Sequence, residues 1–145
     1  MKAIIKQIKG CSFVGLADSN HWIVIDTPKE SCGSGAGSTP MELVLMALSS
    51  CSGADVVSIL EKKKVALSAF EINIDAEQAD SYPKVFTRIN LDYVFYGHEI
   101  KPEHVERAIN LSKEKYCSVF AMLKNSVDIT TSYKIVDNEN KNKID

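Results

Sequence analysis

The chain lacks the charge excess and the hydrophobic runs that mark several classes of protein. Its 17 Lys and Arg are outnumbered by 19 Asp and Glu, which gives a net charge of −2. A nucleic acid or an anionic membrane surface would require a basic patch, so we expect neither as a partner. Lys2, Lys6 and Lys9 interrupt any apolar run at the N-terminus, which argues against a secretory signal there. We identify no run long enough to span a bilayer and predict a cytoplasmic protein.

The cysteines and histidines form no recognised metal or cofactor motif. Four cysteines are present without a Cys-x-x-Cys, and the three histidines are scattered, so zinc-ligand spacing is lacking. Three glycines within residues 33–37 precede a predicted helix, but no Gly-Lys-Ser/Thr follows, so a phosphate cradle is not indicated. We therefore predict neither a metal nor a cofactor. Thiols stay reduced in the cytoplasm unless redox cycling is their function, and an even number of cysteines alone predicts no disulfide.

Length and apolar content indicate one domain over residues 1–145. Apolar residues make up 45% of the chain, which is enough for a hydrophobic core. Residues 1–26 are predicted to form strands, and turn chemistry at residues 18–20 favours a hairpin or meander. The three predicted strands cover residues 3–5, 12–16 and 21–26. A loop rich in Gly and Ser follows over residues 27–38.

A long helix is predicted at about 39–62. Thr39 is a good N-cap, Pro40 suits the first helical position, and Glu42 lies where a capping box requires it. Residues 43–48 are all apolar, and residues 47–54 are nearly all small. A helix that is apolar all round is buried on all sides. We therefore expect this helix at the centre of the molecule, with its own copy in a dimer as one candidate neighbour.

Residues 66–136 are predicted to hold the remaining strands and helices. Apolar and polar residues alternate over residues 70–76 and again over residues 85–96. Such alternation is typical of antiparallel strands that are covered on one face. Arg88 lies on the polar face of its strand, so we interpret it as solvated.

The end of the chain is predicted to be helical and then extended. Pro102 opens a helix whose apolar stripe reaches Tyr116, and Cys117 begins a short separate helix. A last strand covers residues 127–136, and the polar tail 137–145 is expected to fray. The order of strands, helix, strands, helices and strand indicates an α+β fold with antiparallel sheets.

Two motifs in this chain resemble those of the OsmC/Ohr family of thiol peroxidases. They are Ser-Thr-Pro-Met-Glu-Leu with Ser-Cys, within residues 38–51, and Leu-Ser-Lys-Glu-Lys-Tyr-Cys-Ser-Val at residues 111–119. The resemblance extends over nearly the whole chain and is closest to the general OsmC-like branch. It implies an OsmC-like fold in an intertwined homodimer, with two central helices packed across the two-fold axis under a six-stranded sheet. It also implies an active site at the subunit interface.

The resemblance implies that Cys51 is the peroxidatic cysteine and Cys117 the resolving one. A thiolate attacks the peroxide, the resulting sulfenic acid condenses with the second thiol to a disulfide, and a dithiol reductant restores both thiols. The implied substrate is a small hydroperoxide. We expect organic hydroperoxides to be preferred, because an apolar wall is expected beside Cys51, formed by Val44, Leu48, Val119, Phe120 and Met122.

The chain departs from the family's activating pattern, in which an arginine held by a glutamate lies beside the reactive sulfur. Its only arginines are Arg88 and Arg107. Glu42 precedes Cys51 by nine residues, which places it on the opposite face of an ideal helix, so we interpret it as a cap with a supporting role as the alternative. Other sources of positive potential are Lys113, Lys115 and the short helix that begins at Cys117.

Asp55 lies one helical turn after Cys51 and shares its face. An unpaired carboxylate there would disfavour a thiolate. Two other interpretations of Asp55 remain open. It pairs with a residue of the partner subunit, or it marks the point where the helix emerges into water.

In a second hypothesis the protein has the same fold but is not an enzyme. A single cysteine is most often a small buried apolar residue, and the missing arginine favours a non-enzymatic protein that binds a small apolar ligand or senses redox state. Cys11 is interpreted as strand packing. Cys32 lies in the predicted loop, where it is either incidental or able to reach another thiol.

Overall fold

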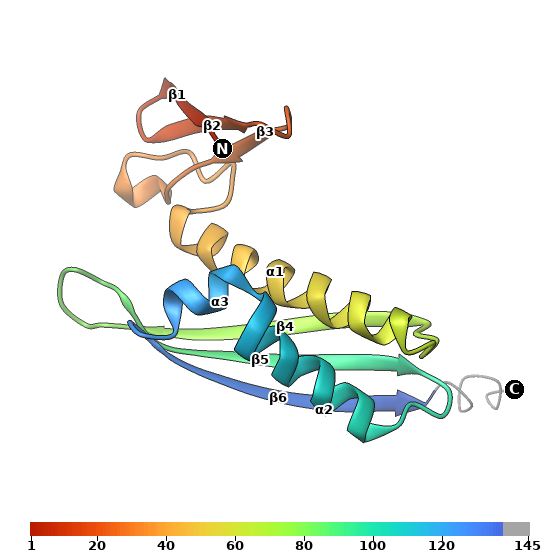
Figure 1. The fold of residues 1–145 in the computed structure, drawn as a ribbon. Helices are drawn as coiled ribbons and strands as arrows, with labels where there is room; N and C mark the ends of the chain where they lie inside the picture. Colours follow the sequence, from red (N-terminus) through yellow and green to blue (C-terminus); the bar gives the residue numbers. More distant parts are fainter. Residues whose placement is uncertain (138–145) are drawn as a thin grey trace, which may run out of the picture. The chain divides into compact units, whose positions relative to one another are not determined.

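The computed structural model describes residues 1–137, which form two compact units: the first is Met1–Met46, and the second begins at Ala47. Each unit contains one three-stranded sheet, and a long helix begins in the first unit and continues in the second (Figure 1). The α+β fold class predicted from the order of elements is confirmed. The predicted tail lies outside the described residues apart from Asp137.

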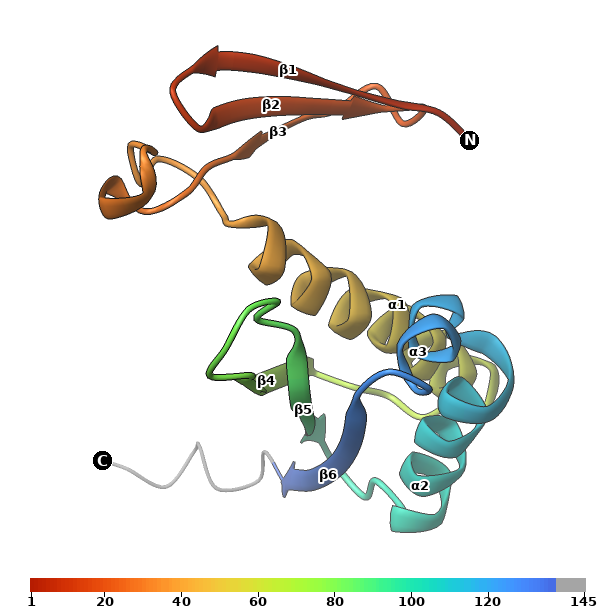
Figure 2. The same cartoon turned by 90° about the vertical axis from the view of Figure 1, so that its left-hand side faces the viewer.

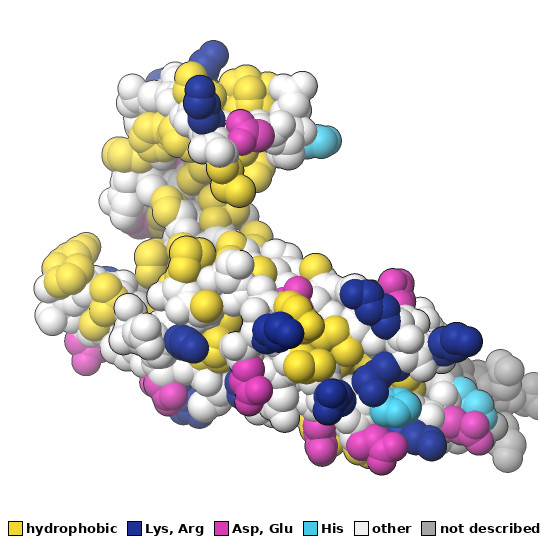
Figure 3. Space-filling model, in the orientation of Figure 1, with side chains coloured by type: hydrophobic (Ala, Val, Ile, Leu, Met, Phe, Trp, Pro, Cys, Tyr) yellow, Lys and Arg dark blue, Asp and Glu magenta, His cyan; other side chains and the backbone are white. Residues whose placement is uncertain are grey.

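The first unit is built on an antiparallel meander of β1 (Ala3–Lys9), β2 (Ser12–Ala17) and β3 (Trp22–Ile25). The predicted strands and their meander connection are therefore confirmed. Six large apolar side chains of this sheet are about half exposed, and hydrophobic side chains gather over this unit in the space-filling view (Figure 3): Ile4, Ile5, Ile8, Trp22, Ile23 and Val24. This single sheet does not bury its own apolar side chains.

A disulfide joins Cys11 to Cys32, whose Cα atoms are 5.4 Å apart. The Cys11 N–H also donates to the Cys32 carbonyl oxygen at 3.0 Å. Gly10 turns the chain with a φ of 56°, and a Cβ atom there would lie 2.6 Å from that same carbonyl oxygen. Our interpretation of Cys11 as strand packing is wrong, and of the two interpretations of Cys32 the structure supports the one in which it reaches another thiol, because the loop closes onto the start of β2.

The loop after β3 is organised by the carboxylate of Asp26, which is 1% exposed. It accepts hydrogen bonds from the hydroxyls of Ser12 and Ser34 and from the backbone N–H groups of Thr27, Ser34 and Ala36. These bonds hold the pKa of Asp26 far below its ordinary value of 3.8, the Ser34 hydroxyl contributing most. The loop is therefore fixed by one ionised side chain.

The helix α1 spans Pro40–Lys62 and begins with the predicted capping box. The Thr39 N–H donates to the Glu42 carboxylate at 2.7 Å, and the Glu42 N–H donates to the Thr39 hydroxyl at 3.3 Å. Its buried residues lie only in the second unit and are Leu48, Ser52, Gly53, Val56 and Leu60. The prediction that the helix is buried on all sides is wrong for the single chain, because one sheet covers one side of it.

The length and composition of α1 are also sufficient for a membrane span. Our statement that no stretch is long enough is therefore corrected. The same test is passed by the core helix of a soluble protein, and Leu48, Val56 and Leu60 are fully buried against the rest of the second unit. We interpret α1 as such a core helix.

The sheet of the second unit has the order β4 (Ala69–Gln78), β5 (Phe86–Gly97) and β6 (Asp128–Asp137). The pair β4–β5 is antiparallel, as predicted, but β5 and β6 are parallel. The prediction of antiparallel sheets is wrong at this pair. The chain between the two strands is a helical crossover, and parallel neighbours require such a connection.

That crossover consists of α2 (Pro102–Leu111), a π-helical turn (Ser112–Tyr116) and α3 (Ser118–Leu123). Figure 2 shows these helices and α1 on one side of the sheet. The apolar face of β5 that they cover is fully buried and contributes Ile89, Leu91, Tyr93 and Phe95. The core of this unit therefore lies between one face of the sheet and the helices.

Candidate functional site

The two cysteines singled out by the sequence lie together in the second unit. The sulfur atoms of Cys51 and Cys117 and a carboxylate oxygen of Asp55 all lie within 4.8 Å of one another. Both thiols are free; Cys117 is buried, and Cys51 and Asp55 are half-buried. The sequence therefore predicted three residues that the fold brings into one cluster.

Gly53 lets α1 pack close to the sheet two residues after Cys51. A Cβ atom at Gly53 would lie 3.1 Å from the Ile72 side chain and 3.4 Å from the Phe70 ring. The helix backbone can approach the sheet here because no side chain intervenes. Cys51 and Asp55 are four residues apart, which places both on the same face of α1.

Cys117 reaches the cluster from the start of α3. Its backbone is extended, with φ −71° and ψ 101°, and its sulfur accepts a hydrogen bond from the Phe120 N–H at 3.3 Å. Burial raises the pKa of the Cys117 thiol to about 11, and a hydrogen bond with Cys51 adds to the rise while the Phe120 N–H opposes it. Cys117 therefore keeps its proton at neutral pH.

A buried chain of hydroxyls supports the cluster. The Ser52 hydroxyl lies 2.7 Å from the Tyr93 hydroxyl and 2.9 Å from that of Ser112, which in turn donates to the Asp55 carboxylate at 3.2 Å. Burial raises the pKa of Tyr93, so the phenol keeps its proton, and either hydroxyl of the Ser52–Tyr93 pair can donate. From the sequence, no functional role was predicted for Ser52, Ser112 or Tyr93. The one sequence signal for these three residues was that their hydroxyl groups fall among apolar side chains, at positions that the patterns predict to be buried.

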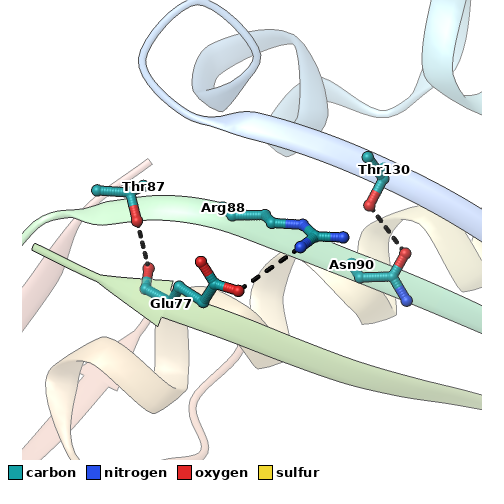
Figure 4. Close-up of polar contacts among 5 residues, drawn as sticks. All are labelled: Glu77, Thr87, Arg88, Asn90 and Thr130. Carbon is teal, nitrogen blue, oxygen red and sulfur yellow. Dashed lines mark hydrogen bonds and ion pairs between the residues drawn. The ribbon is translucent and has the colours of Figure 1, made fainter.

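Within residues 1–137, two of the cations that could lie beside the reactive sulfur, Arg88 and Lys113, contact other groups. Arg88 pairs with Glu77 at 3.6 Å on the uncovered face of the sheet, where the Thr130 hydroxyl donates to Asn90 (Figure 4). The Lys113 ammonium donates to the Thr131 hydroxyl at 3.1 Å. The N-terminus of α3 is the one predicted source of positive potential that contacts a sulfur, through the Phe120 N–H.

The remaining candidate, Glu42, is held in the capping box at the start of α1 and belongs to the first unit. Its side chain is engaged by the backbone of Thr39. The structure gives it the capping role that the helical spacing indicated, and its supporting role in catalysis stays a prediction.

A cavity of about 360 Å³ reaches the cluster at Asp55. Apolar side chains of Ile59, Leu111 and Tyr116 line it, together with Ser58, Lys62 and Lys63. This cavity joins the carboxylate, which lies within 4.8 Å of both sulfurs, to solvent. Small molecules can therefore approach the Asp55 side of the cluster.

Comparisons with known proteins agree with the fold. The family described as OsmC-like protein matches residues 33–132. Protein YhfA of Escherichia coli (strain K12) is 43% identical over 136 residues, which cover 94% of this chain and 98% of that protein.

Solved structures show the same architecture. A hypothetical protein from Aquifex aeolicus VF5 is 30% identical with a TM-score of 0.84, and the match covers 95% of this chain and 97% of the other. An organic hydroperoxide resistance protein OsmC from Legionella pneumophila has a TM-score of 0.69 at 15% identity, over 92% and 97% of the two chains. The latter likeness shows the fold alone.

Proposed function

The chain belongs to the OsmC-like protein family, and we propose that it is a thiol-dependent peroxidase that reduces hydroperoxides through Cys51 and Cys117. The observation that carries this proposal is the approach of the two sulfurs, which lie within 4.8 Å of each other although 66 residues separate them in the sequence. One protein of similar fold is named as an organic hydroperoxide resistance protein, and the proposed class of substrate is the one that this name states.

The proposed reaction begins at Cys51. Its thiolate attacks one oxygen of the hydroperoxide, the O–O bond breaks, and the alkoxide takes up a proton and leaves as the alcohol. Cys51 is thereby oxidised to a sulfenic acid. The Cys117 thiol then attacks the sulfenic sulfur, the S–O bond breaks, and water leaves as the disulfide forms. A dithiol reductant restores both thiols by exchange and is itself oxidised.

The roles of the two sulfurs follow from their surroundings. Cys51 is half-buried and lies within 4.8 Å of Asp55, which lines a cavity that a hydroperoxide can enter. Cys117 is only 2% exposed and holds its proton, so it suits the second step rather than the first. Ile59 and Leu111 offer an apolar surface to the organic group of a substrate.

The proposal is tested by the products of one turnover. The reduced protein is treated with one equivalent of cumene hydroperoxide, and the cross-linked peptides are mapped by mass spectrometry. We expect the alcohol to form in a one-to-one ratio with a Cys51–Cys117 disulfide. Recovery of both thiols with the peroxide unconsumed would contradict the proposal. The Cys11→Ser/Cys32→Ser variant is the control, because it removes the other thiol pair and must give the same product.

The homodimer implied by the family likeness is also part of the proposal. In the single chain, the first sheet leaves six large apolar side chains about half exposed, and a partner of complementary surface would remove them from water. A cytoplasmic location, where dithiol reductants are available, fits the same cycle.

We expect sedimentation of the purified protein to give the mass of a dimer. Ile5 and Ile23 flank Gly15 in neighbouring strands, so both side chains lie on the same face of the sheet. The Ile5→Lys/Ile23→Lys variant is expected to sediment as a monomer, because charged groups cannot enter an apolar interface without a partner. The Glu30→Lys variant changes an exposed loop and should stay dimeric. A monomeric wild-type protein would contradict the dimer.

A further inference from the structure

Three potential metal ligands converge in the second unit, in a chain whose sequence shows no metal motif. The sulfurs of Cys51 and Cys117 and a carboxylate oxygen of Asp55 form the one group of three or more Cys, His, Asp or Glu ligands that meets within residues 1–137. A tetrahedral Zn²⁺ with bonds of about 2.3 Å to sulfur holds two such sulfurs about 3.8 Å apart. The observed spacing, within 4.8 Å, needs only a small closure of the side chains.

The backbone presents these ligands from two elements. Cys51 and Asp55 lie one turn apart on α1, and Cys117 lies at the start of α3. A pair of ligands four residues apart on one helix and a third from another element is a chelating arrangement, because all three can face one point without a change in the backbone.

The carboxylate is oriented by a neighbour, as metal ligands usually are. The Ser112 hydroxyl donates to Asp55 at 3.2 Å, and Ser112 is itself held by Ser52, which lies 2.7 Å from the Tyr93 hydroxyl. Ser52, Tyr93 and Ser112 are fully buried, so the direction of the Asp55 carboxylate is fixed from inside the core.

We propose that the reduced protein binds one Zn²⁺ ion through Cys51, Asp55 and Cys117. The cavity of about 360 Å³ that Asp55 lines gives solvent access on the carboxylate side, from which a water could supply the fourth ligand. The two thiols release their protons to solvent when their sulfurs bind the metal, and no electrons are transferred. Bound Zn²⁺ prevents attack on a peroxide because both sulfurs are occupied, and this inhibitory consequence rests on the peroxidase function proposed above.

Cobalt(II) serves as the spectroscopic probe of this site. The reduced full-length protein is titrated with Co²⁺ without oxygen, and Zn²⁺ is then added. We expect one Co²⁺ per chain, with a thiolate-to-cobalt charge-transfer band and the visible bands of a tetrahedral site, all lost when Zn²⁺ displaces the cobalt. Absence of a thiolate band, or a band that persists in Cys51→Ser, would overturn the proposal.

Matched variants identify the ligands. The Asp55→Asn variant keeps the shape of the side chain and should weaken Co²⁺ binding by about tenfold or more, while Asp75→Asn on the exposed face of β4 should not. The Cys11→Ser/Cys32→Ser variant must retain the spectrum, and loss of the spectrum there would overturn the assignment. Unchanged affinity in Asp55→Asn would also overturn it.

The cobalt titration tests the metal site independently of the peroxidase proposal. A thiolate–cobalt spectrum in a protein that fails to reduce peroxide would support the metal site and contradict only the catalytic function. Peroxide reduction without any cobalt band would overturn only the metal site. If both hold, added Zn²⁺ should stop peroxide reduction, and a chelator should restore it.

Discussion

Cys51→Ser is expected to abolish reaction with the hydroperoxide, whereas Cys117→Ser is expected to preserve the first reaction and to stop turnover. Cys51 supplies the attacking sulfur, so its loss removes the first step. Cys117 acts only after the sulfenic acid has formed. In both variants the steady-state rate with a dithiol reductant should fall by roughly a hundredfold or more, because a residue of the reacting set is missing.

The two variants are separated by a single-turnover experiment. A sulfenic-acid trap such as dimedone should label Cys117→Ser after one equivalent of peroxide and should leave Cys51→Ser unlabelled at this site. The Cys11→Ser variant is a matched control, because it removes a sulfur from the other unit. Full turnover in Cys51→Ser would show that Cys51 is not the reacting sulfur.

Asp26→Ala is expected to release the loop at residues 27–38. The Asp26 carboxylate accepts hydrogen bonds from two hydroxyls and three backbone N–H groups, and alanine would leave these donors without an acceptor in a buried place. We expect cleavage of this loop by a protease to become faster by about tenfold or more, because cleavage follows local opening. Asp18→Asn, at an exposed carboxylate, should leave the rate unchanged.

The same carboxylate predicts a dependence on pH. The folded-state pKa of Asp26 is lowered, so below its ordinary value of 3.8 the open loop binds more protons than the closed one. The stabilisation is therefore fully present above about pH 4 and is lost as the pH falls below that value. The protection factor of the Ala36 N–H against hydrogen exchange should fall in acid, and this fall should be absent in Asp26→Asn. If protection against hydrogen exchange in the loop changes with neither the pH nor the substitution, Asp26 does not hold the loop closed.

The elements of the fold that local chemistry determines were predicted from the sequence. The alternation of apolar residues identified β4 and β5, and the Thr39–Glu42 pair identified the start of α1. The parallel pairing of β5 with β6 was missed because alternation in a strand carries no information about the direction of its neighbour. The burial of α1 was overestimated, because composition does not tell which surfaces belong to a single chain.

The candidate site was predicted only as far as motifs and helical spacing extend. The motifs identified Cys51 and Cys117, and the one-turn spacing identified Asp55. Ser52, Tyr93 and Ser112 come from α1, β5 and the π-helical turn, and a chain of hydroxyls across three elements has no local signature. The convergence of three potential metal ligands was not predicted for the same reason, because a zinc motif is recognised by close spacing in sequence.

The disulfide between Cys11 and Cys32 affects how many electrons the fully reduced protein can donate. Each chain contains four cysteines, and the structure arranges them as one pair in each compact unit. A chain whose cysteines are all reduced can therefore give up two pairs of electrons, although only one pair belongs to the proposed cycle. A stoichiometry of two peroxides per chain would then reflect the second reservoir of thiols rather than a second catalytic centre.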